Sequence, residues 1–272
     1  MTTAPDPSFD ALLPPDMASK VVQVGVAKAS LPLRRLVPLG VLAGAFIGLG
    51  ANFSTVITAD AAISPGIARL LGGLVFSLGL VLVVVSGAEL FTGNTLISVA
   101  FASRKVTARA LLRNWLVVYV ANFVGAIATA ALVEWSGRLD AGGGTVGARA
   151  LAIAEGKSAL PFGQAVASGV LANALVCLAV WMTLSAHSLV DKVMVIVPPI
   201  TAFVAAGFEH SVANMYFFPV ALFHGTTADQ PHLSWGNFIV HNLLPVTLGN
   251  IVGGAVLVGL VYWFVYLRPA SD

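Results

Sequence analysis

The chain carries one motif twice, as GAELFTGN at residues 87–94 and as GFEHSVAN at residues 207–214. Both copies read G-x-E-x4-N, and each interrupts a long apolar stretch with a glycine, a carboxylate and an amide. In the hydrocarbon core of a membrane, a broken helix leaves backbone groups unpaired, and a carboxylate costs a few kcal/mol or more. Such breaks persist only where protein or a water-lined cavity surrounds them. Two matched breaks therefore indicate a transport path through a membrane protein.

The composition excludes a soluble protein, because 58% of the 272 residues are hydrophobic, 10% are charged and the mean hydropathy is +0.92. A helix that crosses a hydrocarbon core of roughly 30 Å needs about 20 apolar residues. Six regions reach this length, and the two motifs break the second and the fifth: Leu36–Ala59, Ile67–Ala102, Trp115–Trp135, Phe162–Ser185, Val193–Phe223 and Asn237–Leu267. We therefore predict an all-α integral membrane protein with six transmembrane helices, of which helices two and five are broken.

The predicted channel domain spans residues 36–267, between an amino-terminal segment at residues 1–35 and a short tail at residues 268–272. The amino-terminal segment is rich in proline and lacks the basic start and apolar stretch of a signal peptide. Within it, Met17–Ala29 has the pattern of a short amphipathic helix on the membrane surface.

Positively charged residues are distributed unevenly about the six spans. Ten of the 14 fall on one side (Lys20, Lys28, Arg34, Arg35, Arg104, Lys105, Arg109, Arg113, Lys192 and Arg268), and four fall on the other (Arg69, Arg138, Arg149 and Lys157). Because loops rich in Lys and Arg stay in the cytoplasm, this distribution predicts a multi-pass protein with both termini cytoplasmic.

The repeat extends beyond the two motifs. An N-x-x-G pattern begins at Asn122 in the third span and at Asn250 in the sixth, so each half has three spans, the second of them broken. An odd number of spans makes the second half enter the membrane from the opposite side. We therefore predict two inverted three-helix repeats, with the breaks close together near the bilayer midplane. Four-residue spacing of glycines predicts close helix packing, within one subunit or between subunits, at Gly40, Gly44, Gly48, Gly249 and Gly253.

Four stretches resemble the formate/nitrite transporter family: ELFTGNT at 89–95, LAN at 171–173 with VCLAVWM at 176–182, GFEHSVANM at 207–215, and HNLLPVTLGN at 241–250. The resemblance covers nearly the whole chain. It implies an aquaporin-like protomer in a homopentamer of the bacterial inner membrane, with a separate anion pore in each protomer. It also implies a transport protein and not an enzyme, with no cofactor and no nucleic-acid partner. The partners would be a small monovalent anion, protons and the lipid bilayer.

The sequence indicates the substrate less specifically than it indicates the family. The stretch FDALLP at 9–14, LA before Asn173 and Phe208 before Glu209 are more similar to the formate channels, whereas GNT at 93–95 is closer to the nitrite branch. Formate is therefore favoured, and nitrite and hydrosulfide stay open, because no residue reads the shape of the anion.

His210, in the second break, is the leading candidate for the chemistry of the pore. A small anion in a narrow apolar pore loses many kcal/mol of hydration unless its charge is met or removed. An ordinary histidine titrates near neutral pH, so an imidazole there can give the anion a proton and let a neutral acid cross. We predict that His210 is this proton donor or relay. The alternative is a histidine that only joins helices by hydrogen bonds.

Three more polar residues are candidates for the substrate path. Thr92 offers a hydroxyl to the anion or to His210; alternatively, Thr92 or Asn94 caps the following half-helix, whose exposed amides would also favour an anion. Asn173 offers amide donors near His210 or joins helices. Lys157 attracts anions into the outer mouth or snorkels at the interface. For His210, Thr92 and Lys157, the family resemblance implies the role in passage of the anion over the structural alternative.

The resemblance further implies an apolar constriction on either side of the histidine, formed by Phe76, Leu80, Leu90, Val176 and Phe203. Without it, each of these residues would be assigned to the core or the lipid-facing surface. The helix breaks are predicted to be supported by Glu89, Asn94, Glu209 and Asn214, because a carboxylate exposed on the route would repel an anion.

Two other functions fit parts of the sequence. A neutral-solute channel of the aquaporin type would also use inverted halves, but the paired Asn-Pro-Ala signature is absent, since Thr95 and Met215 follow the two asparagines. An intramembrane enzyme would need His210 and Glu209 to converge, whereas neighbours on a helix point about 100° apart. No cluster of residues has the spacing of a metal site, and we expect the single Cys177 to serve packing.

Overall fold

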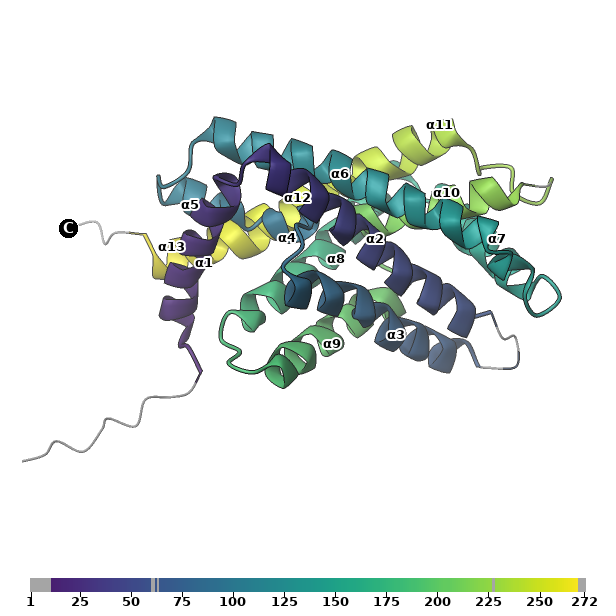
Figure 1. The fold of residues 1–272 in the computed structure, drawn as a ribbon, viewed down its shortest axis with the longest axis horizontal. Helices are drawn as coiled ribbons and strands as arrows, with labels where there is room; N and C mark the ends of the chain where they lie inside the picture. The colour runs from purple at the N-terminus through teal and green to yellow at the C-terminus, as the bar shows by residue number, and fades with distance from the viewer. Residues whose placement is uncertain (1–10, 60–61, 63, 227, 269–272) are drawn as a thin grey trace, which may run out of the picture.

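The computed structural model describes residues 11–59, 62, 64–226 and 228–268, and the chain is helical, with no strand in these ranges (Figure 1). The elements are α1 (Pro14–Ala29), α2 (Leu33–Ile57), α3 (Pro65–Ser86), α4 (Phe91–Asn94), α5 (Ile97–Ala102), α6 (Ala108–Trp135), η1 (Arg138–Asp140), α7 (Thr145–Ser158), α8 (Phe162–Thr183), α9 (Leu189–Ala206), α10 (Ser211–His224), α11 (Trp235–Asn237), η2 (Phe238–Leu243), α12 (Leu244–Ile251), η3 (Val252–Leu260) and α13 (Val261–Tyr266). The short η1 is a 3-10 helix, and η2 and η3 are π-helical.

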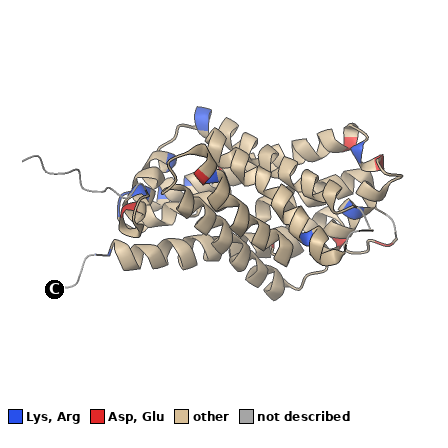
Figure 2. Ribbon diagram, turned by 90° about the horizontal axis from the view of Figure 1, so that it is seen from below, with Lys and Arg blue, Asp and Glu red and all other residues tan. Residues whose placement is uncertain are grey.

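Six helices are long and apolar enough to cross a membrane: α2, α3, α6, α8, α9 and the continuous run Trp235–Tyr266 from α11 to α13. This confirms the predicted all-α fold with six spans. The spans follow the long axis of the molecule, with α1, α5 and α13 at one end and α7 and α11 at the other (Figure 1). We call these the α1 end and the α7 end. Most charged residues gather at the two ends, as expected where the chain meets water (Figure 2).

Some spans begin before the apolar runs that predicted them. The helix α9 starts at Leu189 because Ser188 and Asp191 form a capping box, in which each side chain accepts a hydrogen bond from the backbone of the other. In the same way α6 starts at Ala108, with Thr107 as its N-cap. Polar caps therefore set where these helices begin. The length of an apolar run does not indicate this starting point.

The two motifs break their spans in the same way. The helices α3 and α9 end at Gly87 and Gly207, whose φ angles are +70° and +77°. This left-handed region carries no steric penalty for glycine, which explains why each motif starts with one. The chain then runs extended through Leu90 and His210 before α4 and α10 begin.

A short helix precedes the spans of each half, α1 before α2 and α7 before α8. The helix α1 confirms the helix expected near Met17–Ala29; it packs against α5, α6 and α13, and its place on a membrane surface stays a prediction. The helix α7 was not predicted, because glycines and charges interrupt its apolar residues. Each repeat therefore contains a short helix and three spans. Residues 1–10 of the amino-terminal segment and 269–272 of the tail lie outside the described residues.

The sixth span is continuous but not uniformly α-helical. It passes through the π-helical segments η2 and η3, on either side of α12. The second residue of α12 is Pro245, which has no amide to donate to the preceding turn, and the wider turn of η2 lies directly before it. Apolar periodicity did not distinguish these segments from an ordinary α-helix.

Glycines bring the spans of each half into close contact. Gly125 on α6 packs against the carbonyl oxygen of Val41 on α2, and its counterpart Gly253 on η3 packs against that of Val170 on α8. A methyl group at either glycine would overlap the carbonyl. The close packing predicted from the glycine spacing is therefore internal to the chain.

We expect Gly125→Ala to destabilise the protein by about 1–3 kcal/mol, because the added methyl group forces α2 and α6 apart. Thermal unfolding of the purified protein in detergent, followed by circular dichroism, measures the loss. The control is Gly163→Ala, where an added Cβ has no heavy atom within 4 Å. Equal unfolding temperatures for the two variants would contradict this packing.

Candidate functional site

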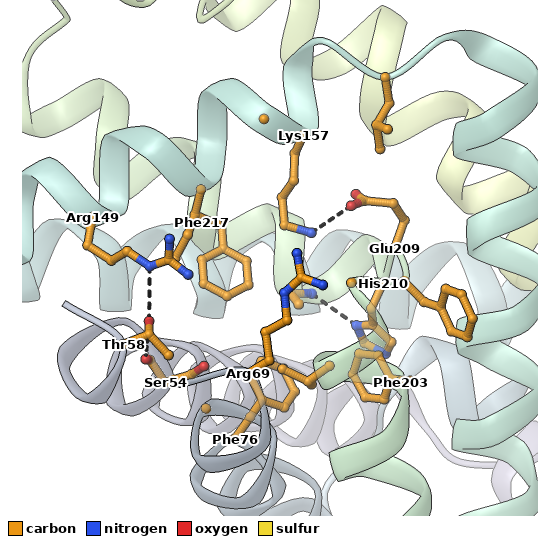
Figure 3. Close-up of a pocket in the computed structure, with 18 residues that line it drawn as sticks. Ser54, Thr58, Arg69, Phe76, Arg149, Lys157, Phe203, Glu209, His210 and Phe217 are labelled. Atoms are coloured by element: carbon orange, nitrogen blue, oxygen red, sulfur yellow. Dashed lines mark hydrogen bonds and ion pairs between the residues drawn. The ribbon is translucent and has the colours of Figure 1, made fainter. Parts of the chain in front are cut away.

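Two cavities lie on either side of the helix breaks. The α7 cavity, of about 370 Å³, is lined by residues that include Phe76, Lys157, Phe203, Glu209 and His210 (Figure 3). The α1 cavity, of about 320 Å³, is lined by residues that include Lys28, Leu80, Glu89 and Leu90. The two cavities are counterparts, since each holds the glycine and glutamate of one motif and a lysine from the short helix of that half.

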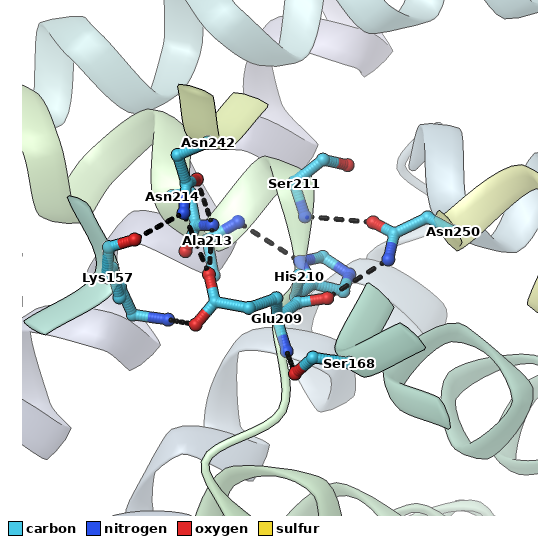
Figure 4. Close-up of polar contacts among 9 residues, drawn as sticks. All are labelled: Lys157, Ser168, Glu209, His210, Ser211, Ala213, Asn214, Asn242 and Asn250. Carbon is cyan, nitrogen blue, oxygen red and sulfur yellow. Dashed lines mark hydrogen bonds and ion pairs between the residues drawn. The ribbon is translucent and has the colours of Figure 1, made fainter. Parts of the chain in front are cut away.

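At the α7 cavity, Glu209 is almost fully buried, and its carboxylate is surrounded by donors (Figure 4). It accepts hydrogen bonds from Lys157 Nζ at 2.8 Å, Asn214 Nδ2 at 2.7 Å and Asn242 Nδ2 at 3.2 Å. Asn242 also donates to the carbonyl oxygen of Lys157, at 3.1 Å, which fixes the lysine on α7. A carboxylate that is paired and hydrogen-bonded in this way is tolerated within a membrane protein.

Glu89 has the same surroundings at the α1 cavity. It accepts from Lys28 Nζ and from Asn94 Nδ2, both at 2.7 Å. Asn94 also donates to Asn114 Oδ1 at 2.9 Å, and Asn114 donates to the carbonyl oxygen of Lys28 at 3.0 Å. These are the contacts that the predicted supporting role of the motif glutamates and asparagines requires.

Sequence reasoning missed three members of these networks, Lys28, Asn114 and Asn242. A signal was present, since Asn114 precedes Asn122 at the same spacing as Asn242 precedes Asn250, with Asn114 directly before the third apolar region and Asn242 within the sixth. Repeated amides in hydrocarbon indicate hydrogen-bond partners that the rest of the chain must supply.

Two asparagines hold the broken backbone in place. Asn250 Oδ1 accepts from the Ser211 amide at 2.9 Å, and its Nδ2 donates to the carbonyl oxygens of Glu209 at 3.0 Å and Gly169 at 2.8 Å. One side chain therefore satisfies the backbone on both sides of His210 and joins it to α8.

Asn122 does the same for the first break. It accepts from the Phe91 amide at 2.9 Å and donates to the carbonyl oxygens of Glu89 at 2.9 Å and Gly40 at 2.7 Å. The expectation that Thr92 or Asn94 caps this half-helix was wrong, because the cap comes from α6. The expectation of exposed amides at this half-helix was wrong for its first amide, that of Phe91, which Asn122 already occupies. The first amide of α10 is bonded in the same way by Asn250.

The His210 side chain is 2% exposed and bridges the two breaks. Its Nδ1 accepts a hydrogen bond from the Ala213 amide at 3.0 Å, so the imidazole is the N-cap of α10. Its Nε2 lies 2.9 Å from Oγ1 of Thr92. Because Nδ1 is an acceptor, the proton of the neutral ring is on Nε2 and is donated to Thr92. The hydroxyl hydrogen of Thr92 is then available to another acceptor.

Apolar side chains adjoin His210 and line parts of both cavities. The Phe203 ring stacks on His210 with centroids 5.8 Å apart and meets Phe76 edge-on at 5.6 Å. Of the five residues predicted for the constriction, Phe76 and Phe203 line the α7 cavity, Leu80 and Leu90 line the α1 cavity, and Val176 is buried and lines neither.

Asn173 is fully buried and lines neither cavity. Its Nδ2 lies 2.6 Å from the carbonyl oxygen of Asn250 and 3.2 Å from Thr95 Oγ1, and its described contacts do not include His210. These contacts correspond to the alternative we considered, a side chain that joins helices. Cys177, one turn further along α8, is also fully buried.

The formate/nitrite transporter family model matches residues 15–264. The chain belongs to this family. Its relatives include the formate channel FocA of Escherichia coli strain K12, which is 44% identical over 97% of each chain. A solved structure described as a pentameric formate channel with formate bound is 46% identical, covers 87% of this chain and 98% of its own, and superposes with a TM-score of 0.81. A second, described as an FNT family ion channel, is 29% identical, covers 92% and 98%, and has a TM-score of 0.83.

These matches confirm the family and the fold of this formate/nitrite transporter. The named relatives are channels and not enzymes. Membership in the family and the six spans make the chain a multi-pass membrane protein.

We expect Asn250→Ala in this transporter to reduce stability by about 2–4 kcal/mol, because the Ser211 amide and two carbonyl oxygens lose their partner in a buried site. Asn237→Ala is the control, since Asn237 is half-buried and its side chain donates to one nearby loop carbonyl, that of His232. Chemical unfolding in mixed micelles gives both free energies. A cost for Asn250→Ala no larger than that of the control would contradict its role in holding the break.

Proposed function

We propose that this protein passes a small monovalent anion, formate above all, between the α7 cavity and the α1 cavity, with His210 as a proton relay. One observation carries the proposal: the imidazole stands between a cavity that holds positive side chains and an apolar constriction, and it bonds the Thr92 hydroxyl. Formate is favoured because FocA and the pentameric structure are both described as formate channels. Nitrite and hydrosulfide are the alternative substrates of the same route.

Electrostatics favours anions in the α7 cavity. Its lysine and arginine side chains, Lys157 among them, give this low-dielectric space a positive potential that raises the local anion concentration. The one carboxylate described in its lining, Glu209, is neutralised by Lys157 and held by asparagines, so it does not repel the anion. We assign Lys157 to the entry of the route on this basis.

The apolar constriction requires the charge to be removed. Phe76, Phe203 and Leu90 offer no hydrogen bond to an anion that leaves water, whereas a neutral acid loses far less hydration. A proton enters the ring at Nδ1, which releases the Ala213 amide, while the Nε2 proton passes to the Thr92 hydroxyl. The hydroxyl hydrogen then goes to the anion once it has passed from the α7 cavity to Thr92, which is buried and lines neither cavity. The ring is left neutral with its hydrogen on Nδ1, and loss of that hydrogen to water with uptake of one at Nε2 restores the starting tautomer. The acid dissociates again in the α1 cavity.

The same relatives support a proposal for the assembly and the location. A homopentamer with one pore in each protomer agrees with the pentameric solved structure. The cytoplasmic membrane of a bacterium, with the α1 end and both termini in the cytoplasm, agrees with the excess of Lys and Arg at that end. The α7 cavity would then face the outside of the cell.

We expect His210→Asn to lower formate uptake into proteoliposomes by about tenfold or more at acidic pH and to flatten its dependence on pH between about pH 4 and pH 8, because asparagine caps a helix but carries no proton. Nitrite and hydrosulfide are measured beside formate. His241→Asn is the control, because His241 is an exposed histidine of the sixth span that lines neither cavity. Wild-type flux in His210→Asn would show that the histidine only packs the helices. Faster flux of nitrite or hydrosulfide would change the substrate and keep the route.

We expect Thr92→Val to reduce formate flux by about tenfold, since valine keeps the shape but removes the hydroxyl from the proton path. Thr92→Ser is the matched control and should retain most of the flux, because it keeps the hydroxyl. Comparable flux in the two variants would exclude Thr92 from the path of the proton.

A further inference from the structure

The α7 cavity contains more positive charge than its carboxylate can neutralise. Besides Lys157, it is lined by Arg69 from α3 and Arg149 from α7. Lys157 is already paired with Glu209 at 2.8 Å. Neither arginine forms an ion pair with any residue that the structure describes. Among the residues that the structure describes, no carboxylate therefore matches the charges of these two guanidinium groups.

The two guanidinium groups are positioned for a ligand in the cavity. Arg149 Nε donates to Thr58 Oγ1 at 3.1 Å, and the Thr58 hydroxyl donates in turn to the carbonyl oxygen of Ser54 at 2.8 Å. The terminal nitrogens of Arg149 and the whole guanidinium of Arg69 have no hydrogen-bond partner among the described residues. The Arg69 side chain extends from α3 into the space between Lys157 and His210 (Figure 3).

The arginines are close enough to influence each other. Burial lowers the pKa of Arg149, and the positive charge of Arg69 lowers it further. Two like charges in one partly enclosed space repel each other, and an anion between them removes that repulsion. The gain from binding is largest where no carboxylate competes for the guanidinium groups.

The α1 cavity has no such pair. Its described lining contains Lys28 and Glu89, which form an ion pair at 2.7 Å, and no arginine. The two cavities correspond in their motif glycine, glutamate and lysine, whereas the arginines line only the α7 cavity.

We propose that Arg69 and Arg149 form a binding subsite in the α7 cavity for a planar anion with two oxygens, such as a small carboxylate, and that it loads the route from the α7 end. The inference rests on the proposed anion transport. A guanidinium presents parallel N–H donors that match two oxygens of one anion, a geometry that a lysine or a single-atom anion does not share. The subsite therefore favours formate over hydrosulfide and lowers the half-saturating concentration at one end only.

The test is initial formate uptake as a function of concentration in right-side-out and in inverted membrane vesicles, which present opposite ends of the protein. We expect Arg69→Gln with Arg149→Gln to raise the half-saturating formate concentration by about tenfold in one orientation only, with the maximal rate unchanged. Arg69→Gln alone removes no described hydrogen bond and should raise it by about threefold in that orientation. Arg138→Gln is the control, an exposed arginine at the same end that does not line the cavity.

A paired Arg69→Lys and Arg149→Lys variant separates charge from geometry. It should recover only part of the affinity for formate, because two ammonium groups keep the charge without the paired donors. Full recovery would overturn recognition of two oxygens, and unchanged half-saturation in the glutamine variants would overturn the subsite itself while the transport proposal stands. Wild-type vesicles that take up no formate from either side would instead overturn the proposed function, and the subsite with it.

Discussion

Two carboxylates buried within the membrane-spanning region, Glu89 and Glu209, constrain the rest of this fold. Each needs a positive partner and amide donors, since removing one partner of a buried ion pair costs about 3–5 kcal/mol. No span supplies the lysine, which comes instead from α1 or α7. The short helices are therefore part of each repeat, because they bring a cation to the broken span. The asparagines of α6 and of the sixth span complete the network and fix the position of the spans around it.

The two halves share a scaffold but differ electrically. At each break, the charge of the buried glutamate is balanced by the charge of one lysine. One asparagine holds the backbone of each break, Asn122 in the first half and Asn250 in the second. Only the α7 side adds arginines and places a histidine beside the constriction. A symmetric framework thus carries two electrically different cavities, and this is the asymmetry that the proposed route would use.

The six spans, the two breaks and the inverted duplication were predictable from the sequence, because hydropathy and a repeated motif report them directly. The helix α7 and the contributions of Lys28, Asn114 and Asn242 were not, since each depends on which side chains meet in space. The apolar constriction was predicted only from the family resemblance. Leu90 and Val176 look alike in sequence, yet Leu90 lines a cavity and Val176 does not. Nothing in apolar periodicity separates a residue that lines a cavity from one in the core.

Asn122 and Asn250 each hydrogen-bond the residues before and after one position in a motif. That position is Leu90 in the first half and His210 in the second. Asn122 and Asn250 bond the backbone on either side and make no use of that side chain. The first break is held in this way around a leucine, which provides no cap to α4. The backbone at this position is therefore held whichever side chain stands there, although in the second half an exchange of His210 would also remove the cap of α10. Exchange of this one side chain would alter the chemistry beside a cavity and leave in place the asparagine hydrogen bonds that hold the break.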